Sequence, residues 1–122
     1  YTEALNEFDK HELEALKGDV LLQIGLCYYN NWDYDMAQEY FSRGIVNKRI
    51  HSDSQSIDVG KAYYYLGKTY ESEGEWEESA NYLKTSLSIL KRHCEEDHED
   101  ILEAQKSLDR VTKCKKEEEE EE

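Results

Sequence analysis

Apolar residues recur three and four positions apart along most of the chain, and no segment alternates apolar and polar residues over the length of a strand. This spacing places side chains on one face of an α-helix. The clearest case is residues 60–91, where two such stripes flank a turn at 73–75. The stripes consist of Tyr63, Leu66, Gly67 and Tyr70, then Ser79, Leu83, Ser86 and Leu87. We predict an all-α chain in which 60–91 forms a helical hairpin.

Similar stripes predict helices in the rest of the chain. They cover residues 1–16, 20–29, 34–48 and 100–116. We expect the helix over 1–16 to end at Lys17-Gly18-Asp19, before the helix over 20–29 begins, because glycine is unfavourable in helix interiors. The polar stretch 50–56 is expected to link the third helix to the hairpin.

The hairpin pattern occurs twice. The motif around Gly67, with Leu66 before it and Tyr70 after it, repeats around Gly25, with Ile24 and Tyr28. The second helices match as well, at Tyr34, Ala37, Phe41 and Gly44 against Trp76, Ser79, Leu83 and Ser86. The period is 42 residues, from Gly25 to Gly67. Self-similarity at such a period is the signature of a helical solenoid.

These motifs resemble the tetratricopeptide repeat (TPR) over residues 18–49 and 60–91. Gly44, Ser79 and Ser86 stand at small positions where the family has alanine, and the proline that usually ends a repeat is missing. The period exceeds the usual 34 by about eight residues, which implies an insertion between repeats. In this respect the chain is similar to kinesin light chains and spindle-orientation adaptors. The resemblance implies stacked antiparallel helix pairs that bind other proteins.

The repeat register divides the chain into six segments. We expect the second helix of a truncated preceding repeat at 1–17, a TPR at 18–49, an insertion at 50–59, a second TPR at 60–93, a loop and capping helix at 94–116, and a disordered acidic tail at 117–122. Asp109 falls on the glycine position of the last helix, which suits a cap with one polar face. The chain starts in the middle of a repeat, so we expect a piece of a longer array.

Composition narrows the function. Among 122 residues, 38% are apolar and 36% are charged, and the net charge is −14. An acidic chain has little general affinity for nucleic acid or anionic membranes. Three widely spaced cysteines do not suggest a disulfide framework. We expect a cytoplasmic protein with no membrane insertion.

No enzyme motif is present: the chain has no glycine-rich phosphate loop, HExxH or CxxC. We therefore predict a non-catalytic protein without a cofactor. His93, Cys94 and His98 could ligate zinc, but their spacing fits no structural zinc motif. We expect this cluster to be an exposed loop, with no metal.

The concave groove is then the candidate site. By the usual geometry of the family, the groove residues form a cationic end beside an apolar patch: Lys61, Lys68, Lys106, Arg110 and Lys113, with Leu22, Leu26, Tyr29 and Tyr64. Glu71 and Glu103 fall on the same series of positions. This pattern predicts a peptide or helix with acidic residues beside a hydrophobic anchor. The alternative is that the cations only keep the protein soluble, with Lys106 and Arg110 pairing with nearby glutamates.

Chaperone-binding TPR proteins carry a carboxylate clamp, whose asparagine position is Leu26 in one repeat and Lys68 in the other, so that function is not predicted. The expected function is a scaffold or adaptor, with a cytoskeletal or motor-associated complex as its context. A structural spacer inside a larger assembly, with no free peptide site, is the alternative.

Overall fold

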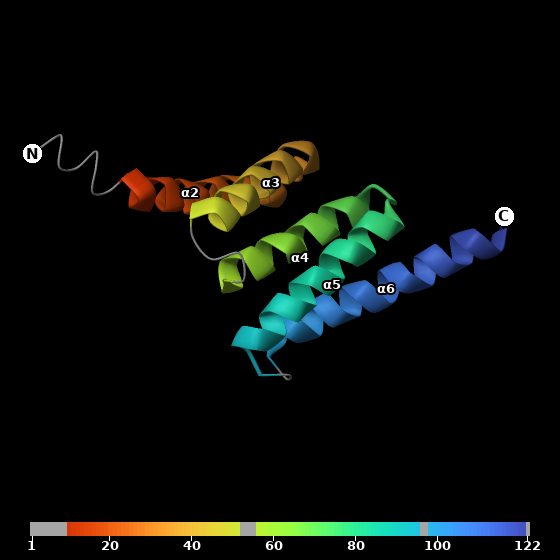
Figure 1. Cartoon of the computed structure of the whole chain (residues 1–122). Helices are drawn as coiled ribbons and strands as arrows, with labels where there is room; N and C mark the ends of the chain where they lie inside the picture. Colours follow the sequence, from red (N-terminus) through yellow and green to blue (C-terminus); the bar gives the residue numbers. More distant parts are fainter. Residues whose placement is uncertain (1–9, 52–55, 96–97, 122) are drawn as a thin grey trace, which may run out of the picture. The chain divides into compact units, whose positions relative to one another are not determined.

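The structure is a computed structural model that describes residues 10–51, 56–95 and 98–121, and these form helices without any strand. The helices are α2 (Lys10–Asn30), α3 (Tyr34–His51), α4 (Ile57–Ser72), α5 (Trp76–His93) and α6 (Glu99–Glu121) (Figure 1). Neighbouring helices pack as antiparallel pairs, which confirms the predicted all-α solenoid. The described helices fall into two compact units, α2 with α3 and α4 with α5 and α6.

The predicted break at Lys17-Gly18-Asp19 is wrong, because α2 runs without interruption from Lys10 to Asn30. Gly18 is instead a contact glycine: a Cβ there would lie 2.6 Å from Oδ1 of Asn47 on α3. Glycine costs about 1 kcal/mol in a helix relative to alanine, and close packing against α3 offsets that cost. Residues 10–17, assigned above to a preceding repeat, therefore belong to α2. Residues 1–9 lie outside the described part.

The second pair shows why the small residues recur. A Cβ on Gly67 would lie 2.7 Å from Cγ of Leu83, so the backbones of α4 and α5 approach closely at this point. Ser79 Oγ donates a hydrogen bond to the Gly67 carbonyl, and Ser86 Oγ donates one to the Gly60 carbonyl, both at 2.7 Å. The two serines replace the family's alanines without leaving a buried hydroxyl unpaired.

The two pairs repeat in structure with the period found in the sequence. Tyr28 stacks on Tyr40 with ring centroids 5.5 Å apart, and 42 residues later Tyr70 stacks on Tyr82 at 5.3 Å. The turns match as well: Trp32 and Gly74 both have positive φ, of 67° and 76°. Stacked aromatic pairs add to the stabilisation that burial provides.

Helix α6 covers the exposed side of α5. Its buried residues Ile101 and Ala104 cluster with Leu87 and Leu90 of α5, and Val111 packs with Ala80 and Leu83. Asp109, at the glycine position of the repeat, is exposed. A helix is therefore present where the capping helix was predicted, with its polar face turned away from α5.

The prediction that the acidic tail is disordered is wrong for residues 117–121, because α6 continues as a helix to Glu121. Glutamate is a good helix former. Like-charge pairs four residues apart cost only a few tenths of a kcal/mol each. Lysines at 113, 115 and 116 stand four positions before glutamates and offset part of that repulsion. Glu122 lies outside the described residues.

Candidate protein-binding surface

Four of the predicted groove residues come together where α4 and α6 meet: Lys61, Tyr64 and Lys68 on α4, and Arg110 on α6. We call this the α4–α6 surface. The two helices run parallel, since Lys61 Nζ lies 3.9 Å from Asp100 Oδ2 near their starts and Arg110 reaches Glu71 near the end of α4. Tyr64 hydrogen-bonds Ser107 between these two points.

Glu71 joins two of the cations. Arg110 donates two hydrogen bonds to its carboxylate, from Nε at 2.6 Å and from Nη2 at 2.9 Å. Lys68 Nζ lies 3.1 Å from the same carboxylate. Burial of Glu71 by itself would raise its pKa, but the hydrogen bonds and charges of Arg110 and Lys68 outweigh burial and lower the pKa. The same contact raises the pKa of Arg110. The carboxylate is therefore ionised and ties α4 to α6.

A cavity of about 230 Å³ opens beside Tyr64. It is lined by Lys61, Tyr64, Tyr65, Leu90, Glu99, Asp100 and Glu103. Tyr64 and Tyr65 meet edge to face with centroids 5.3 Å apart. Burial raises the pKa of both phenols, so both are neutral at pH 7. An apolar wall with neutral hydroxyls and three carboxylates suits an uncharged or cationic group more than an acidic one.

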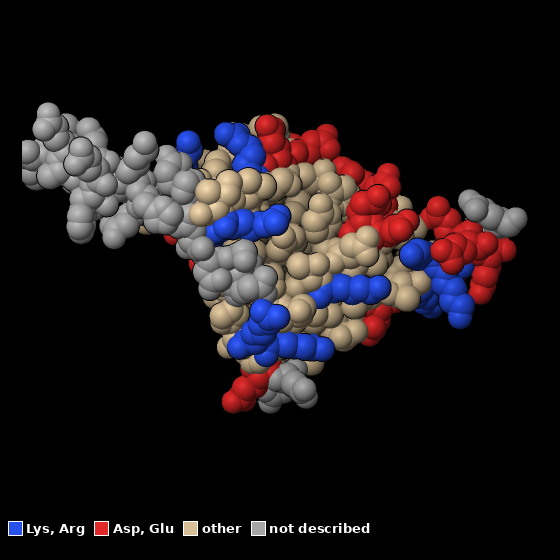
Figure 2. Space-filling view, viewed as in Figure 1, with Lys and Arg blue, Asp and Glu red and all other residues tan. Residues whose placement is uncertain are grey.

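Further basic side chains of the α4–α6 surface lie along α6. Lys106 and Lys113 are exposed. At the end of the helix, lysines 115 and 116 come immediately before the glutamate run, and Figure 2 shows blue and red side chains next to each other there. The α4–α6 surface thus changes from acidic near Asp100 to basic near Arg110.

The remaining predicted residues, Leu22, Leu26 and Tyr29, lie on α2 in the other unit. Leu22 is 7% exposed, and its Cδ2 would lie 2.6 Å from a Cβ on Gly44, so it belongs to the α2–α3 contact. Leu26 is partly buried. The ring of Tyr29 lies 5.6 Å from that of Tyr34. Leu22 is therefore a core residue of the α2–α3 pair, while Leu26 and Tyr29 keep some exposed surface.

The acidic residues of the α4–α6 surface were not among the predicted site residues. Glu71 and Glu103 could have been found, since they occupy the same series of repeat positions as the lysines. Asp100 could not, because its approach to Lys61 depends on how α6 is placed against α4. The pairing of Arg110 with Glu71 agrees with the alternative given above for this residue, in which Arg110 pairs with a nearby glutamate and does not bind a partner.

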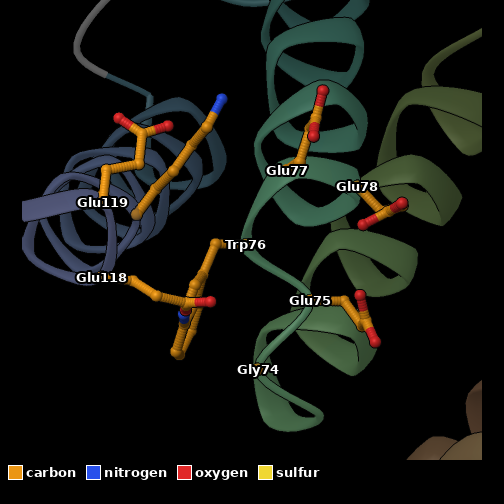
Figure 3. A pocket seen from close by; sticks show the side chains of 8 residues that line it. Gly74, Glu75, Trp76, Glu77, Glu78, Glu118 and Glu119 are labelled. Atoms are coloured by element: carbon orange, nitrogen blue, oxygen red, sulfur yellow. The ribbon is translucent and has the colours of Figure 1, made fainter. Parts of the chain in front are cut away.

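A second cavity, of about 280 Å³, lies between the start of α5 and the end of α6. It is lined by Gly74, Glu75, Trp76, Glu77, Glu78, Lys115, Glu118 and Glu119. Figure 3 shows Trp76 and Glu118 in the same part of the cleft, whereas Glu75 and Glu78 point away from α6. Its glutamates are exposed, and it contains none of the predicted binding residues.

The described residues offer neither a metal site nor a membrane-spanning helix. No group of three or more histidine, cysteine or acidic side chains there is placed to hold a metal ion. No helix in that part of the chain combines the length and the apolar character needed to cross a membrane.

Comparison with known proteins supports the repeat. Residues 61–88 match the sequence model of the tetratricopeptide repeat family. Over 90 residues, or 73% of the chain, the sequence is 24% identical to the clustered mitochondria protein homolog of Xenopus tropicalis. The match spans 7% of the length of that relative. No solved structure matches the chain.

Proposed function

We propose that the chain is a non-catalytic protein-interaction module that docks a peptide or helix of another protein on the α4–α6 surface. The tetratricopeptide repeat at 61–88 supports the general class, protein–protein interaction. The observation that carries the specific proposal is the ionic tie among Glu71, Arg110 and Lys68. It holds two parallel helices together and keeps the surface between them in one geometry, which lowers the entropic cost of binding.

The charges along the surface indicate the orientation of the partner. A hydrophobic anchor would enter the cavity beside Tyr64, and acidic residues would follow α6 toward Lys106 and Lys113. Those two lysines are exposed, so a partner carboxylate can reach them without displacing Glu71.

The context of the complex rests on analogy. The long repeat period favours a cytoskeletal or motor-associated assembly in the cytoplasm. The name of the Xenopus relative refers to clustered mitochondria, which offers a complex associated with mitochondria as a related context.

The test reverses the charge of exposed lysines on the α4–α6 surface. The variant Lys106→Glu with Lys113→Glu changes two exposed lysines of α6, and the control Lys84→Glu with Lys91→Glu changes two exposed lysines of α5. Both variants alter the net charge equally. Proteins captured from a cell extract are quantified for wild type, variant and control.

We expect some proteins to be captured by the wild type and the control but not by the α6 variant. The reason is that exposed charges at the edge of a binding surface act through charge complementarity with the partner. Equal loss with both variants would indicate only the effect of net charge. If all three proteins capture the same set equally, the α4–α6 surface is no docking site, and the structural-spacer alternative becomes the better account.

A further inference from the structure

The outer side of the α2–α3 pair has a shallow groove of about 420 Å³ that the proposed function does not use. It is lined by Lys17, Leu21, Ser42, Arg43, Val46, Asn47 and Ile50. Leu21, only 8% exposed, forms the floor, whereas Val46 and Ile50 are 52% and 66% exposed. We call it the α2–α3 groove. Its volume falls within the range of roughly 300–1,000 Å³ that is usual for ligand pockets.

The second helix pair shows what this face looks like without such a groove. The positions 42 residues after Val46 and Ile50 are Ser88 and Arg92, which are polar and exposed. The positions after Lys17 and Asn47 are Val59 and Ile89, which are 0% and 2% exposed. The first pair therefore reverses the pattern of the second: Lys17 and Asn47 stand where the second pair buries apolar residues, and Val46 and Ile50 stand where it exposes polar ones.

The structure confirms that Asn47 and Ile89 occupy equivalent positions. A Cβ on Gly18 would lie 2.6 Å from Oδ1 of Asn47, and a Cβ on Gly60 would lie 2.9 Å from Cγ2 of Ile89. Both side chains thus occupy the same place against a glycine of the first helix. Where Ile89 packs, Asn47 leaves a buried Oδ1 with no hydrogen-bond partner among the described residues.

This reversal does not serve the stability of the hairpin. An unpaired buried amide oxygen destabilises the folded state, and exposed valine and isoleucine contribute little to it. Positions that break a local rule without a structural gain are where functional sites are expected. The groove is therefore a candidate contact surface.

The charge of the groove indicates the chemistry of its occupant. The chain has 29 acidic and 15 basic residues, yet the seven lining residues include two cations and no carboxylate. The guanidinium of Arg43 lies 5.3 Å from the ring centroid of Tyr40, a cation–π contact that holds it at the rim. An acidic segment with an aliphatic side chain complements both the floor and the rim.

We propose that the α2–α3 groove docks a short acidic segment of another protein through an aliphatic anchor placed on Leu21, Val46 and Ile50, with flanking carboxylates at Lys17 and Arg43. The inference does not rest on the proposed function, because the groove lies on the α2–α3 unit and uses none of the residues of the α4–α6 surface.

The test titrates the ¹⁵N-labelled chain with the peptide EDLDEIDE and follows the backbone amide signals. Two control peptides replace either the two aliphatic residues with alanine or the acids with their amides. We expect shifts at residues 17–21 and 42–50 with the first peptide and much smaller shifts with either control. Binding should weaken with added salt, since screening acts on the flanking carboxylates.

Two variants test the groove itself. Val46→Ser with Ile50→Arg introduces the residues of the second pair, and Arg43→Glu reverses a rim charge. Each should weaken the affinity for EDLDEIDE about tenfold. The controls are Ser88→Ala with Arg92→Ala, at the equivalents of Val46 and Ile50, and Lys84→Glu, one residue before the equivalent of Arg43; all three positions are exposed on α5. These variants should bind as wild type. Circular dichroism melts confirm that each variant is folded.

Other outcomes would overturn the inference. One is no binding of EDLDEIDE up to about 1 mM, the weak end of measurable affinity. Another is unchanged affinity in both groove variants. Shifts confined to the α4–α6 surface would assign the peptide to that site instead. If the wild type is a dimer in sedimentation experiments and Val46→Ser with Ile50→Arg is a monomer, the groove is a contact between copies of the chain.

Discussion

At the scale of single residues, the fold depends on small side chains where helices approach most closely. Gly18, Gly25 and Gly67 each stand where a Cβ would come within 3.0 Å of a side-chain atom on the paired helix. Real Cβ contacts are essentially never that short, so the contacting side chain or its helix would have to shift. These glycines are tolerated in helix interiors because close backbone packing compensates for their poor helix propensity.

Trp32 is the residue with the clearest local strain. It has φ of 67° and is 79% exposed, whereas the equivalent turn residue of the second pair is Gly74, with φ of 76°. A non-glycine residue at positive φ costs about 1 kcal/mol. We expect Trp32→Gly to raise the free energy of unfolding by about 0.5–1 kcal/mol, because glycine adopts this φ without strain but loses more chain entropy on folding.

The measurement for Trp32 is urea denaturation followed by far-ultraviolet circular dichroism. Gly74→Ala is the mirror control, and it should lower the stability by a similar amount. If Trp32→Gly is less stable than the wild type, the exposed indole contributes contacts that outweigh the backbone strain.

At the scale of helices, α6 is attached to the hairpin by two kinds of contact. Ile101, Ala104 and Val111 are buried against α5, and this stripe decides where the helix lies. Arg110 and Lys68 then meet the Glu71 carboxylate, whose side chain is 13% exposed. Because this ion pair is partly shielded from water, it contributes more than a fully exposed pair would.

We expect Glu71→Gln to lower the free energy of unfolding by about 1–2 kcal/mol at pH 7, since it removes charge-assisted hydrogen bonds. The folded-state pKa of Glu71 is lowered from its usual value of 4.5. The stability that its ionisation contributes is therefore present above about pH 4.5 and is lost as the pH falls through the lowered folded pKa.

Urea denaturation of the wild type and Glu71→Gln at pH 7 and at pH 3 measures this difference. The gap between the two proteins should narrow in acid. Glu103→Gln, an exposed neighbour on the same surface, serves as the control and should change little at either pH. A gap that is equally large at both pH values would mean that the amide disturbs packing rather than charge.

At the scale of the whole chain, the excess of negative charge is concentrated at the end of α6. Six of the fourteen net negative charges belong to residues 117–122, so their removal leaves −8. A flexible tail could have competed with an acidic partner for the α4–α6 surface. The observed helix instead carries Glu117 about 10 Å beyond Arg110 along the axis of α6, at 1.5 Å per residue.

Deletion of residues 117–122 should therefore change the binding of an acidic peptide only through the long-range field. We expect the affinity of the α4–α6 surface for an acidic peptide with a hydrophobic anchor to rise about threefold at low salt, where the Debye length is about 30 Å, and to be unchanged at physiological salt, where it is about 8 Å. Fluorescence anisotropy with labelled peptide at both salt concentrations makes the comparison. A gain that persists at physiological salt would indicate direct competition by the tail.

The sequence alone was sufficient for the repeat and its core. The period of 42 residues, the small positions at Gly67 and Ser79, and the polar face of the last helix at Asp109 all follow from local spacing. Spacing determines which side chains share a helix face. Two predictions were wrong because local preferences for or against helix are weak. At Gly18, packing against α3 outweighs the poor helix propensity of glycine. At the glutamate run, the residues extend a helix that α6 has already formed, and extending a helix is easier than starting one.

The pairing of charges was decided only by the tertiary structure. Lys61 meets Asp100 and Arg110 meets Glu71 across 39 residues, at distances that depend on how α6 packs against α4 and α5. The α2–α3 groove likewise needs two helices to bring Lys17 and Arg43 to one apolar floor. A sequence specifies which helix faces are apolar, but the tertiary structure decides which charges pair and which helices enclose a groove. For the charges the reason is that electrostatic energy depends on distance and on shielding from water.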